Sequence, residues 1–185
     1  DYLDLANHCK SIDQEIRFCI NSIGVLEGSI LEKPERKISE IDIEKLSYSF
    51  QVNALPILLL TKYLFPCLRK SSSLRLIQIS AKLGSIQDNE LGGWYSYRLS
   101  KAAGNMGLKN ISIELKRYNP SAVCISIHPG TCDTKFTQNF LESAKSRYKV
   151  HTATESANNI LEVIRNLNPS DSGQFFNWDG QKLDF

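Results

Sequence analysis

A tyrosine and a lysine four residues apart, Tyr97 and Lys101, form the pair in this sequence with the clearest capacity for chemistry. From Ser96 to Asn119 the chain has no proline and is rich in residues that helices tolerate, so both side chains should share one helix face. A tyrosine ordinarily titrates near ~10, but a fixed ammonium beside it favours the phenolate. The pair could therefore move a proton reversibly, although the same spacing is common in ordinary helices.

Several motifs around this pair occur in one order. Tyr97-x-x-x-Lys101 is followed by the small residues Ala102 and Ala103, and Asn21-Ser22-Ile23-Gly24 and Pro129-Gly130-Thr131-Cys132-Asp133-Thr134 flank it along the chain. This set resembles the short-chain dehydrogenase/reductase family, whose motifs are Tyr-x-x-x-Lys, Asn-Asn-Ala-Gly and Pro-Gly-x-x-x-Thr. The second motif matches at its first and last positions only. Gly92 to Tyr97 and the tail Gly173 to Gln181 resemble the subgroup of sniffer-like carbonyl reductases and C-factor-like proteins.

The resemblance implies an NAD(P)-dependent oxidoreductase that interconverts a carbonyl and an alcohol. Tyr97 would act as general acid or base, Lys101 would lower its pKa and bind the ribose hydroxyls, and Asn53 would hold a water of the proton relay. The cofactor would be NADP or NAD, with NADP slightly preferred. Besides Tyr97 and Lys101, its contacts would be Asp4 and Leu5 at the adenine, and Asn21, Ser22, Gly24, Pro129, Gly130, Thr131 and Thr134.

The serine that orients the substrate is the point where the sequence departs from the family. That serine usually stands three residues before a glycine, and counting back from Gly84 gives Ala81. We expect Ser80 to take the role, with Ser85 as the second choice. Ala81 also leaves open a dinucleotide-binding signalling or regulatory protein without catalysis. A sugar-nucleotide epimerase shares Tyr-x-x-x-Lys, but the short chain after the last motif leaves little room for a sugar-nucleotide domain.

The hydropathy pattern predicts the elements that position these residues. Strands are expected over 2–5, 16–25, 74–80, 122–128 and 173–181, and helices over 43–69, 96–117 and 152–167. Pro56 should distort the first long helix near Asn53. We expect His128 to be structural, and the family resemblance makes 135–151 a lid over the substrate. The predicted fold class is α/β, a Rossmann-like doubly wound parallel sheet in three layers, with residues 1–185 forming one domain.

The composition of the chain argues against several classes of partner. A net charge of +2 with interleaved signs argues against nucleic acid, and the longest apolar runs are too short to span a bilayer. Five cysteines without Cys-x-x-Cys spacing argue against a disulfide framework or a zinc site, so we expect no metal and a cytoplasmic protein. Trp94 and Tyr95 favour an apolar or aromatic carbonyl substrate. In the family the helices carrying Asn53 and Tyr97 commonly form a homodimer bundle, which we expect here.

The family's glycine-rich strand–turn–helix, Gly-x-x-x-Gly-x-Gly, precedes the matching region in other members and is not found in these 185 residues. We therefore expect about sixty upstream residues in the functional protein, an estimate from the size of one βαβ unit. Such a helix N-terminus would hold the pyrophosphate. If the protein instead begins at Asp1, titration calorimetry should detect no NAD(P)H binding.

Overall fold

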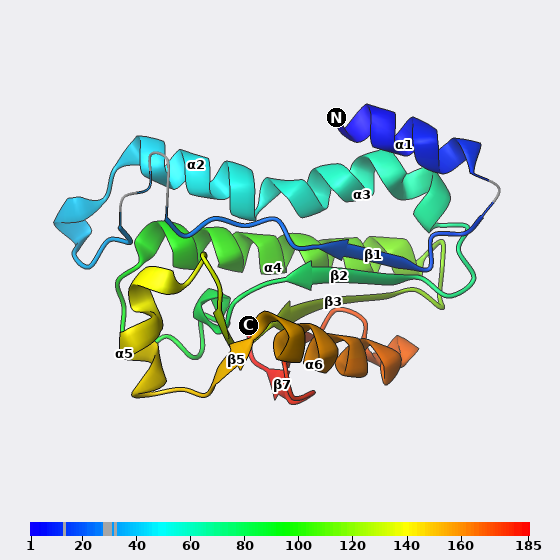
Figure 1. Ribbon diagram of the computed structural model, residues 1–185. Helices are drawn as coiled ribbons and strands as arrows, with labels where there is room; N and C mark the ends of the chain where they lie inside the picture. Colours follow the sequence, from blue (N-terminus) through cyan, green and yellow to red (C-terminus); the bar gives the residue numbers. More distant parts are fainter. Residues whose placement is uncertain (13, 28–30, 32) are drawn as a thin grey trace.

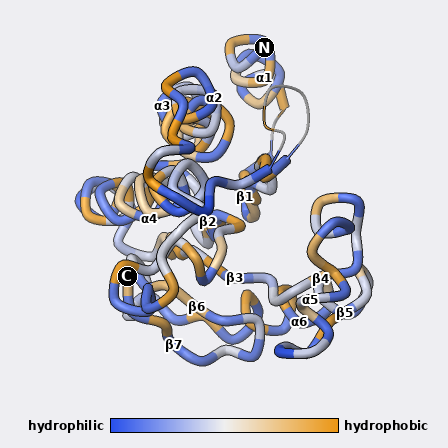
Figure 2. Tube along the Cα trace, turned by 90° about the vertical axis from the view of Figure 1, so that its left-hand side faces the viewer, coloured by the Kyte–Doolittle hydropathy of each residue, from blue (hydrophilic) through white to orange (hydrophobic). Residues whose placement is uncertain are grey.

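The computed structural model describes residues 1–12, 14–27, 31 and 33–185. A mostly parallel sheet lies between two layers of helices (Figures 1 and 2). The helices are α1 (Tyr2–Ser11), α2 (Ile43–Asn53), α3 (Leu55–Leu68), α4 (Tyr95–Lys116), α5 (Leu141–Lys145) and α6 (Ala153–Arg165). The strands are β1 (Phe18–Asn21), β2 (Arg75–Ile79), β3 (Val123–His128), β4 (Thr131–Asp133), β5 (Val150–Thr152), β6 (Phe175–Asn177) and β7 (Lys182–Leu183).

The main sheet has the order β1-β2-β3-β6-β7. The pairs β1–β2, β2–β3 and β3–β6 are parallel, and β7 pairs antiparallel to β6. Helices connect the parallel strands, as parallel pairs require: α2 and α3 join β1 to β2, α4 joins β2 to β3, and α6 precedes β6. The chain is thus an α/β protein with a Rossmann-like three-layer sheet, as the sequence predicted.

The core lies on both faces of this sheet because successive strand residues point to opposite sides. Leu76 of β2 packs with Leu68 of α3 and Leu108 of α4 in one apolar cluster. Its neighbour Ile77 faces the other way, toward Val163 of α6. Helices α3 and α4 therefore cover one face of the sheet, with α1 packed on α3 and α2 packed on α4, and α6 covers the other face (Figure 2).

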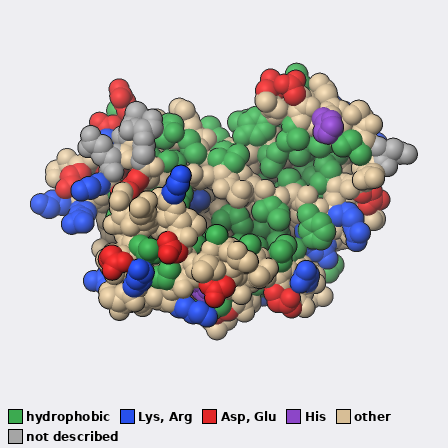
Figure 3. Space-filling view, viewed as in Figure 1, with side chains coloured by type: hydrophobic (Ala, Val, Ile, Leu, Met, Phe, Trp, Pro, Cys, Tyr) green, Lys and Arg blue, Asp and Glu red, His purple; other side chains and the backbone are tan. Residues whose placement is uncertain are grey.

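The first strand departs from the sequence prediction. It is limited to Phe18–Asn21 and is not buried, since Phe18 and Ile20 are 57% and 43% exposed. The reason is that β1 is the edge strand of the sheet, and only its Cys19 side packs against a helical layer. Figure 3 shows hydrophobic side chains gathered around β1 and α1 on this face.

The predicted strand over residues 2–5 is wrong, because this segment is the start of α1. Asp1 caps the helix by accepting a hydrogen bond from the backbone N–H of Leu3 at 2.6 Å. Tyr2, Ala6 and Cys9 recur at helical spacing, and Tyr2 stacks on Tyr63 of α3 with ring centroids 6.0 Å apart. A short apolar run fits either a strand or one helix face, and here packing on α3 selects the helix.

The long helix predicted over 43–69 is interrupted near Asn53, as Pro56 led us to expect. The break falls at Ala54, between α2 and α3, and Pro56 lies in the first turn of α3, where its missing N–H costs little. Taken together, Ile43–Leu68 is long and apolar enough to cross a membrane by length and composition alone, contrary to our sequence estimate. Within this fold α2 and α3 instead pack against α4.

Candidate functional site

Tyr97 and Lys101 lie on the buried face of α4, next to the carboxyl edge of the sheet. Their side chains are only 7% and 4% exposed, and the Lys101 ammonium lies 5.7 Å from the centre of the Tyr97 ring. Lys101 Nζ donates a hydrogen bond of 3.3 Å to the carbonyl of Ile79, the last residue of β2. The strand end therefore holds the lysine in place beside the tyrosine.

The Lys101 ammonium has donors that a ligand carrying hydroxyl groups could use. An ammonium has three donors, and among the described residues Lys101 has the Ile79 carbonyl as acceptor and no carboxylate partner. A Cβ added at Gly24 would come within 3.2 Å of Lys101 Nζ and 3.3 Å of Asn53 Oδ1. Only glycine fits here without crowding these two atoms, and the spare donors of Lys101 suit the ribose hydroxyls of a dinucleotide.

Asn53 is fully buried at the end of α2 and joins the strand end after β1 to α4. Its Oδ1 accepts from the backbone N–H of Val25 at 2.7 Å, and its Nδ2 donates to the Val25 carbonyl at 2.9 Å and to Ser100 Oγ at 3.0 Å. Because α2 ends at Asn53, this amide can bond to the backbone of Val25 in the loop after β1. Asn53 therefore lies at the predicted place beside Gly24, with its amide already engaged by protein groups.

Burial shifts the pKa values of both Tyr97 and Lys101. It raises the pKa of Tyr97 well above its ordinary value, and it lowers the pKa of Lys101 to about 8. Our expectation that the ammonium would lower the tyrosine pKa is wrong for the protein as it stands. Loss of solvation on burial disfavours the charged phenolate and accounts for the raised pKa. The pair thus keeps the proton on the phenol, the state needed by a general acid.

Ser80 is not placed for orienting a substrate. Its buried hydroxyl donates to Asn105 Oδ1 at 2.7 Å, on the side of α4 beyond Lys101. Ala81 is the residue that packs in one cluster with Tyr97. Ser85 is also buried, and its Oγ accepts from the backbone N–H of Asp88 at 3.1 Å, which leaves the hydroxyl proton of Ser85 without an acceptor among the described residues.

The two residues assigned to the adenine are placed elsewhere. Asp4 and Leu5 lie on the exposed side of α1, and the Asp4 carboxylate is 4.0 Å from the N-terminal amine. Helix α1 lies over the end of α3, at the opposite end of the sheet from the start of α4 (Figure 1). The adenine prediction depended on a strand ending at Asp4, so it is wrong.

The remaining predicted cofactor residues follow the ends of β1 and β3. Asn21 is buried, and its Nδ2 donates to Gln78 Oε1 of β2 at 2.7 Å, whereas Ser22 next to it is exposed. After β3, Gly130 has a φ of +80°, and Pro129, Thr131 and Thr134 are half-buried. The carboxyl ends of parallel strands meet at one edge, so these residues share the edge that holds Lys101.

His128, the last residue of β3, has a pKa lowered to about 4, chiefly by burial and next by the charge of Lys82. It is therefore neutral near pH 7. Its Nδ1 is buried without a hydrogen-bond partner among the described residues. The structural part expected for His128 stays a prediction.

The segment after Thr134 covers the tyrosine. The Phe136 ring lies 6.3 Å from the Tyr97 ring, and the Phe140 ring lies 4.8 Å from the Trp94 ring, which itself meets Tyr97 edge-on at 6.3 Å. Asn139 donates to the Glu27 carboxylate at 2.6 Å and ties this segment to the loop after β1. Three aromatic rings thus enclose the Tyr97 side chain.

Sequence reasoning missed several residues that build the site. Gln78, Ser100 and Asn105 hold the predicted residues by side-chain hydrogen bonds, while Glu35 caps the start of α4 and Phe136 covers Tyr97. Glu35 lies in a polar loop with no local pattern that sets it apart. The aromatic spacing of Phe136 and Phe140 was the one signal that could have been read.

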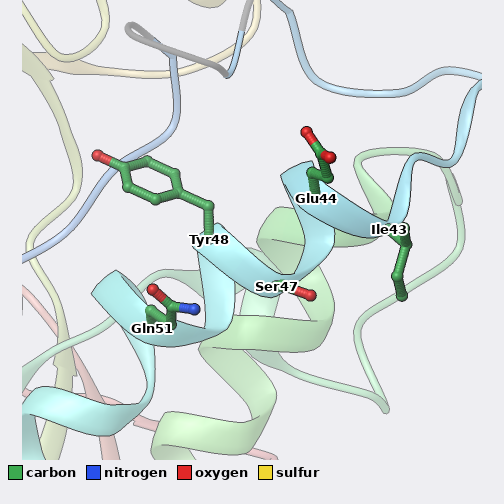
Figure 4. A pocket seen from close by; sticks show the side chains of 5 residues that line it. All are labelled: Ile43, Glu44, Ser47, Tyr48 and Gln51. Carbon is green, nitrogen blue, oxygen red and sulfur yellow. The ribbon is translucent and has the colours of Figure 1, made fainter.

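A separate shallow hollow of about 320 Å³ lies on the outer side of α2. Figure 4 shows its lining side chains, Ile43, Glu44, Ser47, Tyr48 and Gln51, along two turns of that helix. None of the predicted site residues lines it. The hollow is thus separate from the predicted site beside α4.

Comparison with known proteins identifies the family of the chain. The family model described as short chain dehydrogenase matches residues 2–145. The chain belongs to the short-chain dehydrogenase family. Among curated relatives of this dehydrogenase, C-signal of Myxococcus xanthus is 31% identical over 146 residues, which is 79% of this chain and 82% of that one. The 1-hydroxy-2-glutathionyl-2-methyl-3-butene dehydrogenase of a Rhodococcus species is 29% identical over 147 residues, or 80% of this chain and 62% of that one.

Solved structures extend the likeness over all 185 residues of this chain. The carbonyl reductase Sniffer of Drosophila melanogaster superposes with a TM-score of 0.84 at 26% identity, covering 100% of this chain and 73% of that one. The NADPH-bound carbonyl reductase from chicken fatty liver gives a TM-score of 0.82 at 27% identity, covering 100% and 71%. The predicted likeness to sniffer-like and C-factor-like members is confirmed.

Proposed function

We propose that this dehydrogenase interconverts a carbonyl and an alcohol with a nicotinamide dinucleotide, and that Tyr97 is its general acid and base. The observation that carries the proposal is the buried pair of Tyr97 and Lys101, whose ammonium has spare donors close to Gly24. The cofactor would supply or accept the hydride. The chain's own residues would bind the cofactor, orient the substrate and protonate its carbonyl oxygen.

In the direction of reduction, Tyr97 would give its phenolic proton to the carbonyl oxygen. Burial keeps that proton on the phenol at neutral pH, so the phenol is protonated when reduction begins. Lys101 would bind hydroxyl groups of the cofactor ribose with its free donors and stabilise the phenolate that forms. Asn53 would keep the loop after β1 against α4, and we retain its predicted part in a water relay as part of the proposal.

The substrate class follows from the walls around the tyrosine. Trp94, Phe136 and Phe140 surround Tyr97, and Leu26 and Ala81 pack in contact with it. Such walls favour an apolar or aromatic aldehyde or ketone. The chicken carbonyl reductase holds NADPH, and this supports a slight preference for NADP over NAD.

The test is reduction of a panel of aromatic and aliphatic aldehydes and ketones with NADPH and with NADH. We expect Tyr97→Phe to lower kcat at least about 100-fold, because a positioned proton donor contributes about 10²–10⁴. Tyr118→Phe, at an exposed tyrosine just beyond the end of α4, is the matched control and should keep full turnover. Unchanged turnover in Tyr97→Phe would remove tyrosine from the mechanism.

A second candidate is a dinucleotide-binding signalling or regulatory protein without turnover. One observation favours it: Ala81 packs against Tyr97 where the family places a serine, and the Ser80 hydroxyl is already used by Asn105. The relative C-signal is consistent with such a role. Saturable binding of NADPH by calorimetry, with no turnover of any carbonyl in the panel, would favour this candidate over the enzyme.

We further propose a cytoplasmic homodimer formed through α3 and α4, with no nucleic-acid or membrane partner. Leu99, Met106 and Ile113 recur every seven residues and are exposed along α4, and Leu55 and Leu58 of α3 are exposed as well. Light scattering after size-exclusion chromatography should give twice the chain mass. Met106→Glu should shift it toward the monomer, whereas a monomeric wild type would contradict the dimer.

A further inference from the structure

The start of α4 lacks an ordinary cap. Trp94 occupies the N-cap position with a left-handed φ of 51°, and its indole ring cannot accept a hydrogen bond from the first turn. Gly92 and Gly93 before it also have positive φ values, 63° and 65°. The first N–H groups of a helix need acceptors, and a non-glycine residue in the left-handed region needs support from its surroundings. Both must come from elsewhere in the chain.

Glu35, which lies 61 residues before Ser96 in the sequence, supplies the acceptors for the first turn and the support for Trp94. Its Oε2 accepts from the backbone N–H of Ser96 at 3.2 Å, its Oε1 accepts from the Ser96 hydroxyl, and its backbone carbonyl accepts from the N–H of Trp94. A Cβ at Gly93 would lie 3.4 Å from that same carbonyl oxygen, so the two segments are in close contact. Glu35 therefore brackets the first turn of α4 on both sides of Tyr95.

The Glu35 carboxylate is 5% exposed, and no Lys or Arg among the described residues forms an ion pair with it. It is accordingly held by the helix start itself, where N–H groups and the helix dipole favour a negative charge. A buried carboxylate is costly unless it is well bonded. Its position indicates that the contact with Ser96 is specific.

We propose that Glu35 is a positioning residue for Tyr97, an inference that rests on the proposed catalytic part of that tyrosine. Ser96 directly precedes Tyr97, and Trp94 packs edge-on against its ring at 6.3 Å. Glu35 binds both Ser96 and Trp94, so it fixes the backbone before the tyrosine and the aromatic wall beside it. A displacement of about 1 Å of a reacting group can cost about 100-fold in rate.

The test compares Glu35→Ala, Glu35→Gln and Ser96→Ala in the full chain, with Glu40→Ala as control. Glu40 lies in the same loop, and its exposed carboxylate likewise accepts a backbone N–H, that of Arg36 at 2.7 Å. We expect Glu35→Ala to lower kcat about 10- to 100-fold while KM for NADPH changes less than about 3-fold. Glu35→Gln keeps an acceptor for Ser96 and should retain most of kcat.

Ser96→Ala removes one of the bonds and should cost less than Glu35→Ala. Combined with Glu35→Ala it should add no further loss, because both changes break the same contact. Tyr97→Phe sets the reference: if it keeps full turnover, the proposed function fails, whatever the Glu35 variants do.

A second readout does not depend on turnover. The chain has two tryptophans, so a Trp178→Phe background leaves Trp94 as the single indole emitter. There, Glu35→Ala should shift the Trp94 emission to longer wavelength as the ring loses its packing, and Glu40→Ala should not. The proposal is overturned if Glu35→Ala matches Glu40→Ala in emission and kcat, or if Glu35→Gln loses as much kcat as Glu35→Ala.

Discussion

Replacing Asn53 by alanine tests how the fold holds its candidate site together. The side chain is fully buried and makes three hydrogen bonds, two with the Val25 backbone and one with Ser100 Oγ. Each such bond contributes about 1 kcal/mol net. Val25 is only half-buried, so water can reach part of the backbone that Asn53 leaves. We therefore expect Asn53→Ala to lower the free energy of unfolding by about 3 kcal/mol.

Urea unfolding followed by circular dichroism measures this change, since the midpoint and slope give the free energy by linear extrapolation. For a chain of this size about 3 kcal/mol corresponds to a fall in Tm of about 6–12 °C. Ser100→Ala should cost about 1 kcal/mol, because it removes one of the three bonds of Asn53. Asn158→Ala, at an exposed position of α6 with no side-chain bond among the described residues, is the control.

The reasoning fails if Asn53→Ala costs less than about 1 kcal/mol, or no more than Asn158→Ala. A small loss would mean that the loop after β1 is held by other contacts. The break at Ala54 would then be a consequence of Pro56 alone. A large loss with an unchanged slope would confirm that the amide links α2, the β1 end and α4.

Three further predictions concern residues beside this link. The Lys101 amine has a pKa of about 8 in the folded protein and 10.5 ordinarily, so the unfolded chain binds its proton more tightly. As pH rises between these two pKa values, this group makes the folded protein about 3 kcal/mol more stable. Lys101→Met should lack that gain when urea unfolding is compared at about pH 7 and about pH 10. Ala81→Ser places a hydroxyl beside Tyr97 and should raise kcat about 10-fold. Its control, Ala157→Ser on α6, should leave kcat unchanged. If Ala81→Ser gives no gain in kcat, position 81 is not the place of the substrate-orienting serine. Gly84→Ala should lower stability by about 1–3 kcal/mol in thermal unfolding. The reason is that the added Cβ would lie 2.9 Å from Lys101 Cβ and 3.1 Å from the Lys101 backbone carbon. An unchanged Tm would contradict this close contact.

Elements with a strong local pattern could be predicted from the sequence. The helix expected over 96–117 is Tyr95–Lys116, and that over 152–167 is Ala153–Arg165. The strands expected over 74–80 and 122–128 are Arg75–Ile79 and Val123–His128. The two helices each carry an apolar stripe at helical spacing, and the two strands are short apolar runs buried on both faces, which is typical of a parallel sheet.

The sequence also determined which residues could meet at the site. Tyr97 and Lys101 share a helix face because of the period of the helix itself. Asn53 and Gly24 were identified by motif, and parallel strand order brings them to the same edge. The sequence favoured Ser80 over Ser85 as the serine that orients the substrate. The structure instead puts the Ser80 hydroxyl on Asn105 and Ala81 against Tyr97, because adjacent residues at a strand end point to opposite sides.

Tertiary structure alone decided the rest. The segment 2–11 is a helix because α3 offers it an apolar face, which four residues of local pattern cannot show. Glu35 meets Ser96 across 61 residues, and no local propensity encodes that contact. The protonation of Tyr97 was predicted with the wrong sign from the lysine alone, because the shift comes from burial, and burial is a property of the folded chain as a whole.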